Sequence, residues 1–330
     1  MQQHTTVSLI SLGCPKNKVD AEVMLGDLME HGYDIVLDPA EAEVIIVNTC
    51  GFITDAKVES VETLLEMAQF KEQGTCRALI ASGCLSGRYG EDLWEEMPEV
   101  DAFVGVTQYP RMHDIVAAVL SGRRTLDCGL DASVVGGGRR ILTTAPHLAY
   151  LKIGEGCDNR CSYCAIPAIR GGYRSRPLEQ VVAEARELVA GGVKELIVVA
   201  QDTTRYGLDL DGRPQLAELL RQLDALPGIE WVRVLYLYPE MLSSQLLQTM
   251  ATLPHVCNYV DLPLQHVDDE VLRRMHRRSN RAQIEDILTR VRALPEPFLI
   301  RTTMIVGFPG ETEAQFQELL DFIEDQPFDL

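Results

Sequence analysis

Strand patterns and helix patterns alternate along almost the whole chain, and this alternation restricts the fold more than any other feature of the sequence. In residues 1–125, the apolar runs TVSLISL, EVIIVNT, RALIASG and DAFVGV have the length and composition of buried strands. Amphipathic helices are predicted between them, at 19–31 and at 55–71. Because strands joined through helices run parallel and are covered on both faces, we expect an α/β domain with a doubly wound parallel sheet.

The alternation resumes at residue 147 and runs to residue 330. Strands are predicted at LAYLKIG, ELIVVAQ, WVRVLYLY, YVDLPLQ and FLIRTTMIVG, and helices at 178–190, 214–225, 241–252, 280–293 and 311–325. Five strand–helix units predict a (β/α) barrel. The barrel is partial, since the sequence ends at PFDL, the expected start of a sixth strand. The Gly- and Arg-rich residues 126–146 predict a linker between the two domains.

Charge and hydropathy narrow the class of protein. The chain of 330 residues has 30 Lys and Arg against 49 Asp and Glu, a net charge of −19. This balance disfavours a nucleic-acid partner and suits a basic protein better. No run of 18 apolar residues predicts a membrane span. The N-terminus has no basic start and no cleavage signal, so we expect a cytoplasmic protein with no membrane partner.

One group of cysteines follows the first predicted strand of the second domain. Cys157, Cys161 and Cys164 have the spacing C-x3-C-x2-C in LKIGEGCDNRCSYC. A [4Fe–4S] cluster normally takes four thiolates, so three would leave one iron open to another ligand. The alternatives are a zinc site, which usually needs a fourth ligand, and three unrelated cysteines.

A second group of cysteines is spread over the first domain. Cys14, Cys50 and Cys84 each follow a predicted strand and each have a glycine beside them. Because parallel strands end at one edge of a sheet, and glycine lets backbones approach closely, these thiols are expected to converge on a second metal cluster. The alternative is three separate buried cysteines. Cys76, Cys128 and Cys257 lack this pattern and are expected to be structural.

Longer motifs resemble a known family. The cysteine spacing, with an aromatic residue before the last cysteine, resembles the radical S-adenosylmethionine superfamily. Over essentially the whole chain the sequence resembles the methylthiotransferases, through SLGCPKNKVDAE, VNTCGFITDAKVES, GEGCDNRCSYCAIP, RGGYRSRPLE, VVAQDTTRYG, YVDLPLQH and RTTMIVGFPGET. One branch of that family modifies an adenosine in transfer RNA, and another modifies an aspartate β-carbon of ribosomal protein S-twelve. The segments GCPKN and QDTTRYG match the second branch.

The resemblance implies cofactors, contacts and partners. It implies two [4Fe–4S] clusters, held by the two cysteine groups, and S-adenosylmethionine bound to the open iron of the cluster on Cys157, Cys161 and Cys164. The residues expected near this cofactor are Tyr163, Gln201, Asp202, Gln265 and Arg301. The implied partners are ribosomal protein S-twelve or the small ribosomal subunit, and a flavodoxin-like or ferredoxin-like electron donor. The family's C-terminal TRAM domain is absent from this sequence.

Two other functions stay open at this point. One is modification of transfer RNA, and the other is a non-catalytic iron–sulfur or zinc module. The basic run at residues 273–278 is expected to be a solvated helix face, with a surface that contacts the ribosome as the alternative.

Overall fold

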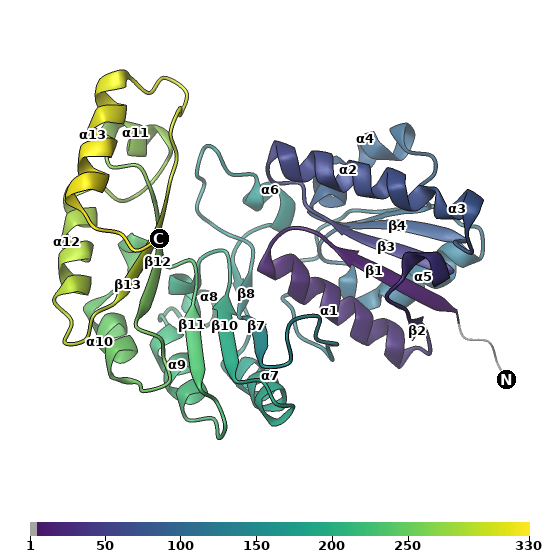
Figure 1. Cartoon of the computed structure of the whole chain (residues 1–330), viewed down its shortest axis with the longest axis horizontal. Helices are drawn as coiled ribbons and strands as arrows, with labels where there is room; N and C mark the ends of the chain where they lie inside the picture. The colour runs from purple at the N-terminus through teal and green to yellow at the C-terminus, as the bar shows by residue number, and fades with distance from the viewer. Residues whose placement is uncertain (1–4) are drawn as a thin grey trace. The chain divides into compact units, whose positions relative to one another are not determined.

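The computed structural model describes residues 5–330 and divides the chain into two compact units (Figure 1). The first unit runs to Thr143 and includes Ala165–Gly172. The second unit comprises Thr144–Cys164 and Tyr173–Leu330. The short segment 165–172 therefore packs with the first unit although it lies between two stretches of the second.

The first unit is a parallel sheet covered by helices. Its elements, with short 3-10 helices labelled η, are β1 (Thr6–Ser11), α1 (Pro15–Glu30), β2 (Asp34–Ile35), η1 (Pro39–Glu41), β3 (Val44–Thr49), α2 (Thr54–Ala68), α3 (Phe70–Gln73), β4 (Ala78–Gly83), α4 (Cys84–Glu96), β5 (Ala102–Val104), η2 (Tyr109–Arg111), α5 (Met112–Leu120), β6 (Thr125–Asp127) and α6 (Ile166–Arg170). The strand order is β2-β1-β3-β4-β5-β6, and every neighbouring pair is parallel.

Alternate residues of the central strands point to opposite faces of this sheet. On β3, Val44 and Ile46 pack with α1 and α5 in one core, while Ile45 and Val47 pack with α2 and α4 in another. Figure 1 shows α1 along one face and α2 along the other. The apolar runs are continuous because both faces are buried, and this confirms the predicted doubly wound sheet.

The strand order creates a switch point between β1 and β3. From β1 the chain goes outward to β2, and it then returns to the other side of β1 to form β3. In open α/β sheets, ligands bind at such a point, beyond the carboxyl ends of the strands. Any ligand of this unit is therefore expected beyond Ser11 and Thr49, where β1 and β3 end.

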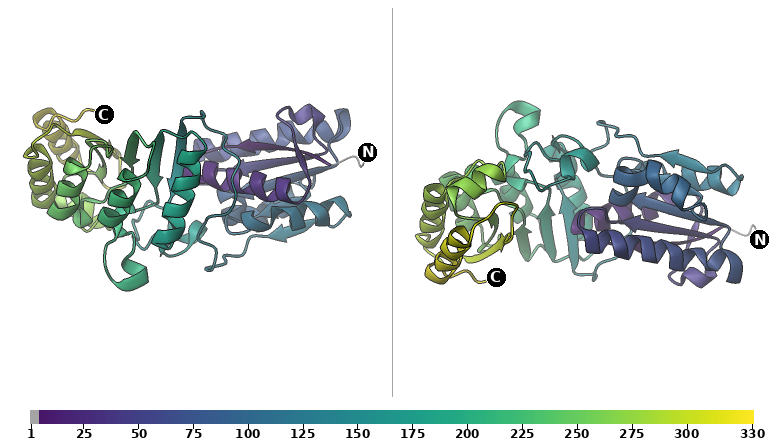
Figure 2. Two further views of the ribbon diagram at one scale, coloured as in Figure 1. Left: turned by 90° about the horizontal axis from the view of Figure 1, so that it is seen from below. Right: turned by 90° about the horizontal axis from the view of Figure 1, so that it is seen from above.

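The second unit is a curved succession of strands and helices (Figure 2), in which all paired strands are parallel except the short pair β8 and β9. Its elements are β7 (Leu148–Lys152), β8 (Gly154–Glu155), β9 (Arg174–Ser175), α7 (Leu178–Ala190), β10 (Glu195–Val199), η3 (Thr203–Arg205), α8 (Leu208–Asp211), α9 (Leu216–Asp224), β11 (Trp231–Val234), η4 (Pro239–Met241), α10 (Ser244–Thr252), β12 (Tyr259–Gln265), α11 (Asp269–Arg274), α12 (Arg281–Arg292), β13 (Leu299–Met304) and α13 (Glu313–Asp325). β7, β10 and β11 pair in parallel, as do β12 and β13.

The end of the described chain pairs with β13. Asp329 donates its N–H to the Ile300 carbonyl at 3.0 Å, and the Leu330 carbonyl accepts from Thr302 N–H at 3.0 Å. Asp329 and Leu330 thus bond to β13 as a neighbouring strand would, but no strand is assigned to residues 327–330, and the sixth strand stays a prediction. The succession of strands and helices agrees with the predicted partial barrel.

Most predicted helices occur within two or three residues of their expected bounds. Capping boxes at Asn280 and Thr312 fix the starts of α12 and α13, as the polar residues before each helix indicate. The helix predicted at 55–71 is divided at Gln69 into α2 and α3, although Gln69 itself keeps helical dihedral angles, φ −62° and ψ −28°. Its N–H bonds to the Glu66 carbonyl three residues earlier, at 3.2 Å, which tightens the turn at this point. In the described part of the chain, no helix is both long and apolar enough to cross a membrane.

Replacement of Phe103 tests the core of the first unit. Its side chain is fully buried on β5, so Phe103→Ala is expected to lower the free energy of unfolding by about 3–5 kcal/mol. Leu37→Ala is the control, because Leu37 is 97% exposed and its loss should change stability by less than about 0.5 kcal/mol. Urea unfolding measures both, and equal effects would contradict the assigned core.

Candidate metal centres

Three cysteines of the first unit lie at the carboxyl edge of its sheet. Cys14 is the N-cap residue of α1, just beyond β1. Cys50 directly follows β3, and Cys84 is the first residue of α4, directly after β4. The three strands are neighbours and parallel, so the structure brings these residues to one edge. We call them the first cysteine group.

Glycines allow the strand ends to approach closely. A Cβ atom on Gly13 would lie 2.9 Å from the Cβ of Cys50, and one on Gly83 would lie 2.7 Å from the carbonyl oxygen of Thr49. Both glycines have a positive φ, +88° and +97°, which disfavours other residues. The glycine next to each of these strand ends is therefore required by the crowding.

The side chain of Asn17 ties the three strand ends together. Its Nδ2 donates to the carbonyl of Thr49 at 2.8 Å and to that of Leu12 at 3.3 Å. Its Oδ1 lies 3.5 Å from the Sγ of Cys84, and Asn48 donates to its backbone carbonyl at 2.7 Å. One buried amide thus fixes the backbone on which all three cysteines are mounted.

A buried guanidinium lies beside this group. Arg170 ends α6, in the segment that packs with the first unit. Its Nη2 donates to Asn17 Oδ1 at 2.6 Å and to Asp20 Oδ2 at 3.1 Å, and it lies 3.5 Å from Cys84 Sγ. The positive charge is therefore held against a candidate metal ligand.

The pKa values of these thiols record the balance of burial and charge. Burial raises the pKa of Cys84 to about 11 although Arg170 opposes it, and burial also raises the pKa of Cys50. Burial raises the pKa of Cys14 as well, but the charges of Lys16 and Arg170, with backbone N–H groups, outweigh it, so the pKa is lowered. The neighbouring thiols Cys14 and Cys50 both act on Cys84, which shows that the three are electrostatic neighbours.

The second cysteine group lies in the second unit, in the loop after β8. Cys157 and Cys161 are buried and Cys164 is half-buried. Cys164 donates its N–H to the Cys161 carbonyl at 3.0 Å, which closes a turn. Burial, followed by Asp202 and the thiols of Cys164 and Cys161, raises the pKa of Cys157 to about 11. The loop thus gathers its three thiols.

This loop is anchored on the end of α11. Ser162 donates its N–H to the Met275 carbonyl at 3.1 Å and its hydroxyl to the Arg274 carbonyl at 2.9 Å. His276 Nδ1 lies 3.1 Å from the Arg160 carbonyl. His276 has a φ of +57°, a conformation that costs energy for this residue type and is held by such contacts.

As placed, neither cysteine group is compact enough for its three thiolates to share one zinc ion. A zinc ion at ~2.3 Å from each thiolate in a tetrahedron would place the sulfurs about 4 Å apart. Within residues 5–330, one set of three residues has its possible ligand atoms within 4.8 Å of one another, namely Asp27, His31 and His113. The sulfur atoms of neither cysteine group lie that close together. A four-iron cube spans more space and binds one thiolate per iron. Three thiols per group, none of them in a disulfide, are the number expected for a cube with one iron open, and this assignment stays a prediction.

Two predicted cofactor contacts lie against the second group. Burial raises the pKa of Tyr163, and the adjacent Cys161 raises it further, so this ring lies beside the loop thiols. Asp202 follows β10 and accepts a hydrogen bond from Asn159 of the loop at 3.0 Å. Burial raises the pKa of Asp202, and the hydrogen bonds it accepts oppose that shift.

A third predicted contact, Gln201, belongs to a buried polar network beside the same loop. Its Nε2 donates to Glu155 Oε1 at 3.0 Å, and Lys152 pairs with Glu155 Oε2 at 3.0 Å. The Oε1 atom of Gln201 is buried without a hydrogen-bond partner. Since buried polar atoms are normally paired, this acceptor is suited to a ligand donor.

The remaining two predicted contacts lie on β12 and β13. Gln265 ends β12 with a φ of +73°, at a register shift in the pairing with β13. Arg301 donates to Asp261 Oδ1 at 3.0 Å, and Asp261 Oδ2 accepts from Tyr236 N–H at 3.0 Å. These bonds join β11, β12 and β13, and a role of Gln265 and Arg301 in cofactor binding stays a prediction.

Sequence reasoning missed two residues near the loop. The thiols of Cys161 and Cys157 contribute to the raised pKa of Tyr238, after burial as the main cause. The guanidinium of Arg277 lies 4.5 Å from the centre of the Tyr238 ring and donates to the Pro263 carbonyl at 2.9 Å. Arg277 is buried, so the expectation of a solvated face for residues 273–278 is wrong at this position. The available signal in the sequence was the pair of tyrosines, Tyr236 and Tyr238, that follows β11.

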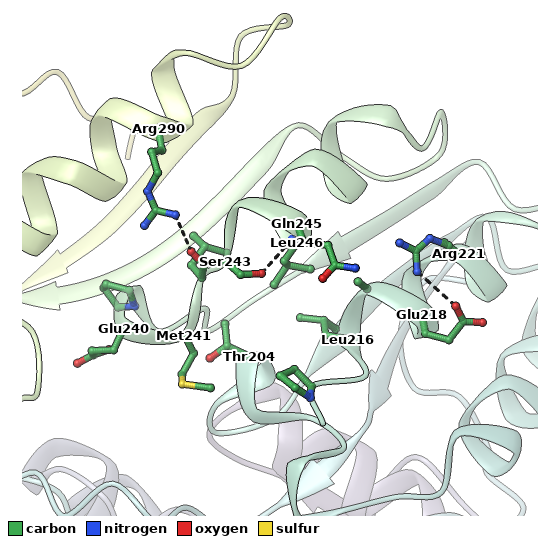
Figure 3. A pocket seen from close by; sticks show the side chains of 14 residues that line it. Thr204, Leu216, Glu218, Arg221, Glu240, Met241, Ser243, Gln245, Leu246 and Arg290 are labelled. Atoms are coloured by element: carbon green, nitrogen blue, oxygen red, sulfur yellow. Dashed lines mark hydrogen bonds and ion pairs between the residues drawn. The ribbon is translucent and has the colours of Figure 1, made fainter. Parts of the chain in front are cut away.

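The second unit also has a hollow of about 630 Å³, which is not lined by the cysteine loop. It is bordered by the start of α9, the turn after β11 and the start of α10 (Figure 3). Arg221 pairs with Glu218 at 3.3 Å, and Arg290 donates to the Leu242 carbonyl at 3.2 Å. The six cysteines and five predicted contacts are not among the residues that line it, so this hollow is not the predicted cofactor site.

The parallel strand–helix succession and the three-thiol loop near its start define a radical S-adenosylmethionine protein. Comparison with family models agrees, since residues 151–323 match the radical SAM superfamily and residues 6–105 match Uncharacterized protein family UPF0004. Among solved structures, the radical S-adenosylmethionine methyltransferase TsrM from Kitasatospora setae has a TM-score of 0.69 at 15% identity, over 98% of this chain and 72% of that chain. The cobalamin-dependent radical enzyme OxsB has a TM-score of 0.67 at 13% identity, over 99% and 53%. At these identities the likeness establishes the fold.

Sequence relatives identify the family. The ribosomal protein uS12 methylthiotransferase RimO of Geobacter sulfurreducens is 51% identical over 329 residues, which cover 98% of this chain and 73% of the relative. That of Clostridium acetobutylicum is 48% identical over 318 residues, which cover 96% and 71%. The chain therefore belongs to the RimO family of radical S-adenosylmethionine methylthiotransferases. Its cofactors are those of the family, S-adenosylmethionine and [4Fe–4S] clusters.

Replacement of Gly83 tests the crowded strand ends. Gly83→Ala is expected to lower the free energy of unfolding by more than the ~1–3 kcal/mol of a strained backbone, because its Cβ meets Thr49, and to reduce the iron bound by the first group. Gly122→Ala is the matched control, since Gly122 has a φ of +85° but no atom within 4 Å of the added Cβ. Urea unfolding and iron analysis after anaerobic reconstitution measure both effects. Equal losses in the two variants would argue against close approach.

Proposed function

We propose that this protein attaches a methylthio group to the β-carbon of an aspartate in ribosomal protein uS12. The observation that carries this proposal is the presence of two separate groups of three thiols, one in each unit. The relatives with 48–51% identity, named for uS12 methylthiotransfer, support the same reaction. A generic radical enzyme needs the group in the second unit alone, whereas the addition of sulfur calls for a second centre.

We assign one cluster to each group. Cys157, Cys161 and Cys164 would hold the cluster that binds S-adenosylmethionine, and Cys14, Cys50 and Cys84 would hold the auxiliary cluster. The unit to Thr143, with Ala165–Gly172, is then the auxiliary-cluster domain, and the other unit is the radical domain. When bound, these cofactors supply three things: the sulfur, the methyl group, and the carbon radical that removes a hydrogen atom from an unactivated carbon.

The residues of the second unit hold and shield the cofactor. Burial of Cys157 and Cys161 keeps water away from the loop. The anchors on Ser162 fix the loop before any ligand arrives, which reduces the ordering cost of binding. The unpaired Oε1 of Gln201 is an acceptor for a polar N–H or O–H group of S-adenosylmethionine.

The residues of the first unit favour thiolates. Metal ligation requires the deprotonated sulfur, and Cys14 has a lowered pKa because of nearby cations. The segment Cys14-Pro15-Lys16-Asn17 accounts for this locally: Pro15 starts α1, Lys16 supplies charge, and Asn17 ties the strand ends. Lys16, in the motif that distinguishes the ribosomal-protein branch, thus favours the thiolate form of Cys14.

Partners follow from this assignment. A flavodoxin-like or ferredoxin-like protein would supply the electron for the cluster of the second unit. The substrate is uS12, free or in the small ribosomal subunit, and the place of action is the cytoplasm, where ribosomes are assembled. The net charge of −19 suits a basic substrate.

A two-substrate assay tests the proposed reaction. The reconstituted protein is incubated with S-adenosylmethionine, a reductant and either uS12 or transfer RNA, and products are analysed by mass spectrometry. A methylthio adduct on an aspartate of uS12 is expected. Modification of transfer RNA alone would reject the proposal in favour of the adenosine branch, and absence of both adducts and of 5′-deoxyadenosine would indicate a non-catalytic cluster protein.

Single cysteine variants separate the two centres. Cys157→Ala is expected to abolish 5′-deoxyadenosine formation, because three thiolates are the minimum in that loop. Cys50→Ala is expected to retain 5′-deoxyadenosine formation but to abolish the methylthio product. Chromatography of nucleosides and mass spectrometry of uS12 measure the two outcomes.

The control is Cys257→Ala, which removes a thiol outside both groups and should retain both products. Loss of 5′-deoxyadenosine in Cys50→Ala to the same degree as in Cys157→Ala would contradict separate roles for the two groups.

A further inference from the structure

The segment after the second cysteine group contributes a charge to the first. The chain leaves the second unit after Cys164, forms α6 within the first unit, and returns to the second at Tyr173. Arg170, the last residue of α6, is 1% exposed. Burial raises the pKa of Cys50 and Cys84, and the charge of Arg170 opposes that shift; the same charge helps to lower the pKa of Cys14. It is therefore near all three thiols and not just near the one that it contacts.

The contacts of Arg170 fix its position on two sides. On one side, Asn17 Oδ1 at 2.6 Å and Asp20 Oδ2 at 3.1 Å accept from its Nη2 atom. On the other side lies Cys84 Sγ, 3.5 Å from the same nitrogen. Because Asn17 also holds the strand ends, the guanidinium and the cysteines are parts of one rigid arrangement.

A fixed cation beside a ligand sulfur affects the two redox states of a cluster unequally. Reduction adds one negative charge in a buried place where charges interact strongly. Hydrogen bonds to the sulfurs and nearby charge are main determinants of the potential of such clusters. An arginine remains protonated at all relevant pH values. Arg170 should therefore stabilise the reduced state and raise the reduction potential.

We propose that Arg170 is a positioning residue that orients Cys84 through an N–H···S hydrogen bond and raises the reduction potential of the auxiliary cluster. This inference rests on the proposed function, in which Cys14, Cys50 and Cys84 hold that cluster. It goes further, because it assigns control of the reduction potential to the charge of Arg170, which is not a ligand of the cluster. The residue lies on α6, in the segment of the first unit that follows Cys164 in the sequence.

A purely structural role predicts different behaviour. In that case the Arg170–Asp20 pair would only join α6 to α1, and removal of either partner would loosen the site in the same way. In our account the two replacements act with opposite sign. Arg170→Gln removes the cation near the sulfur, whereas Asp20→Asn removes the anion that offsets it.

The test is a potentiometric titration of the auxiliary cluster, monitored by electron paramagnetic resonance. It uses the full chain with Cys157, Cys161 and Cys164 replaced by alanine, so that a single cluster remains, and the intact two-cluster protein for comparison. Arg170→Gln should shift the midpoint to a more negative potential, Asp20→Asn should shift it to a more positive one, and Arg170→Lys, which keeps the charge, should lie between Arg170→Gln and the parent.

The outcomes distinguish this inference from the proposed function. A parent that binds no cluster at Cys14, Cys50 and Cys84 would reject the proposed function itself. A parent with a cluster whose midpoint is unchanged by Arg170→Gln, or is shifted in the same direction by Arg170→Gln and Asp20→Asn, would overturn the role of Arg170. Should Arg170→Gln fail to fold, the double variant with Asp20→Asn avoids an unpaired buried charge. The midpoint of that double variant is compared with that of Asp20→Asn alone. A more negative midpoint in the double variant supports the role, and an equal midpoint overturns it.

Discussion

The close approach of three parallel strand ends is the constraint on which the rest of the first unit depends. Gly13 and Gly83 have positive φ values and no room for a side chain, and Asn17 bonds the loops after β1 and β3. This crowding places Cys14 and Cys50 at the switch point between β1 and β3, with Cys84 at the end of the neighbouring β4. Ligands of α/β folds bind at such a point. The placement of these cysteines is thus a consequence of topology, since they lie where other α/β proteins place ligand-binding loops.

The two units reach similar donor sets by different means. In the second unit, one short loop carries all three thiols and is fixed from outside by residues of α11. In the first unit, three strands carry one thiol each, and the local charges of Lys16 and Arg170 oppose the cost of burying thiolates. The arrangement in the second unit needs only local sequence, whereas the arrangement in the first unit needs a folded sheet.

That difference explains what could be predicted from the sequence. The strands of both units and the C-x3-C-x2-C loop are local patterns, and the glycine beside each of Cys14, Cys50 and Cys84 indicated convergence. Arg170 could not be predicted, because its partner Asn17 is 153 positions away. Arg277 was misassigned to a solvated face, because its burial depends on packing against Tyr238, which lies far away in the sequence, just before η4.

Iron and sulfide analysis tests the central claim, that the chain has two independent centres of three thiolates each. The intact protein, a variant with alanine at Cys14, Cys50 and Cys84, and one with alanine at Cys157, Cys161 and Cys164 are reconstituted anaerobically. The account predicts about eight iron atoms per intact chain and about four in each variant, since each cube has four irons. About four iron atoms in the intact protein, or loss of all iron from either variant, would contradict it.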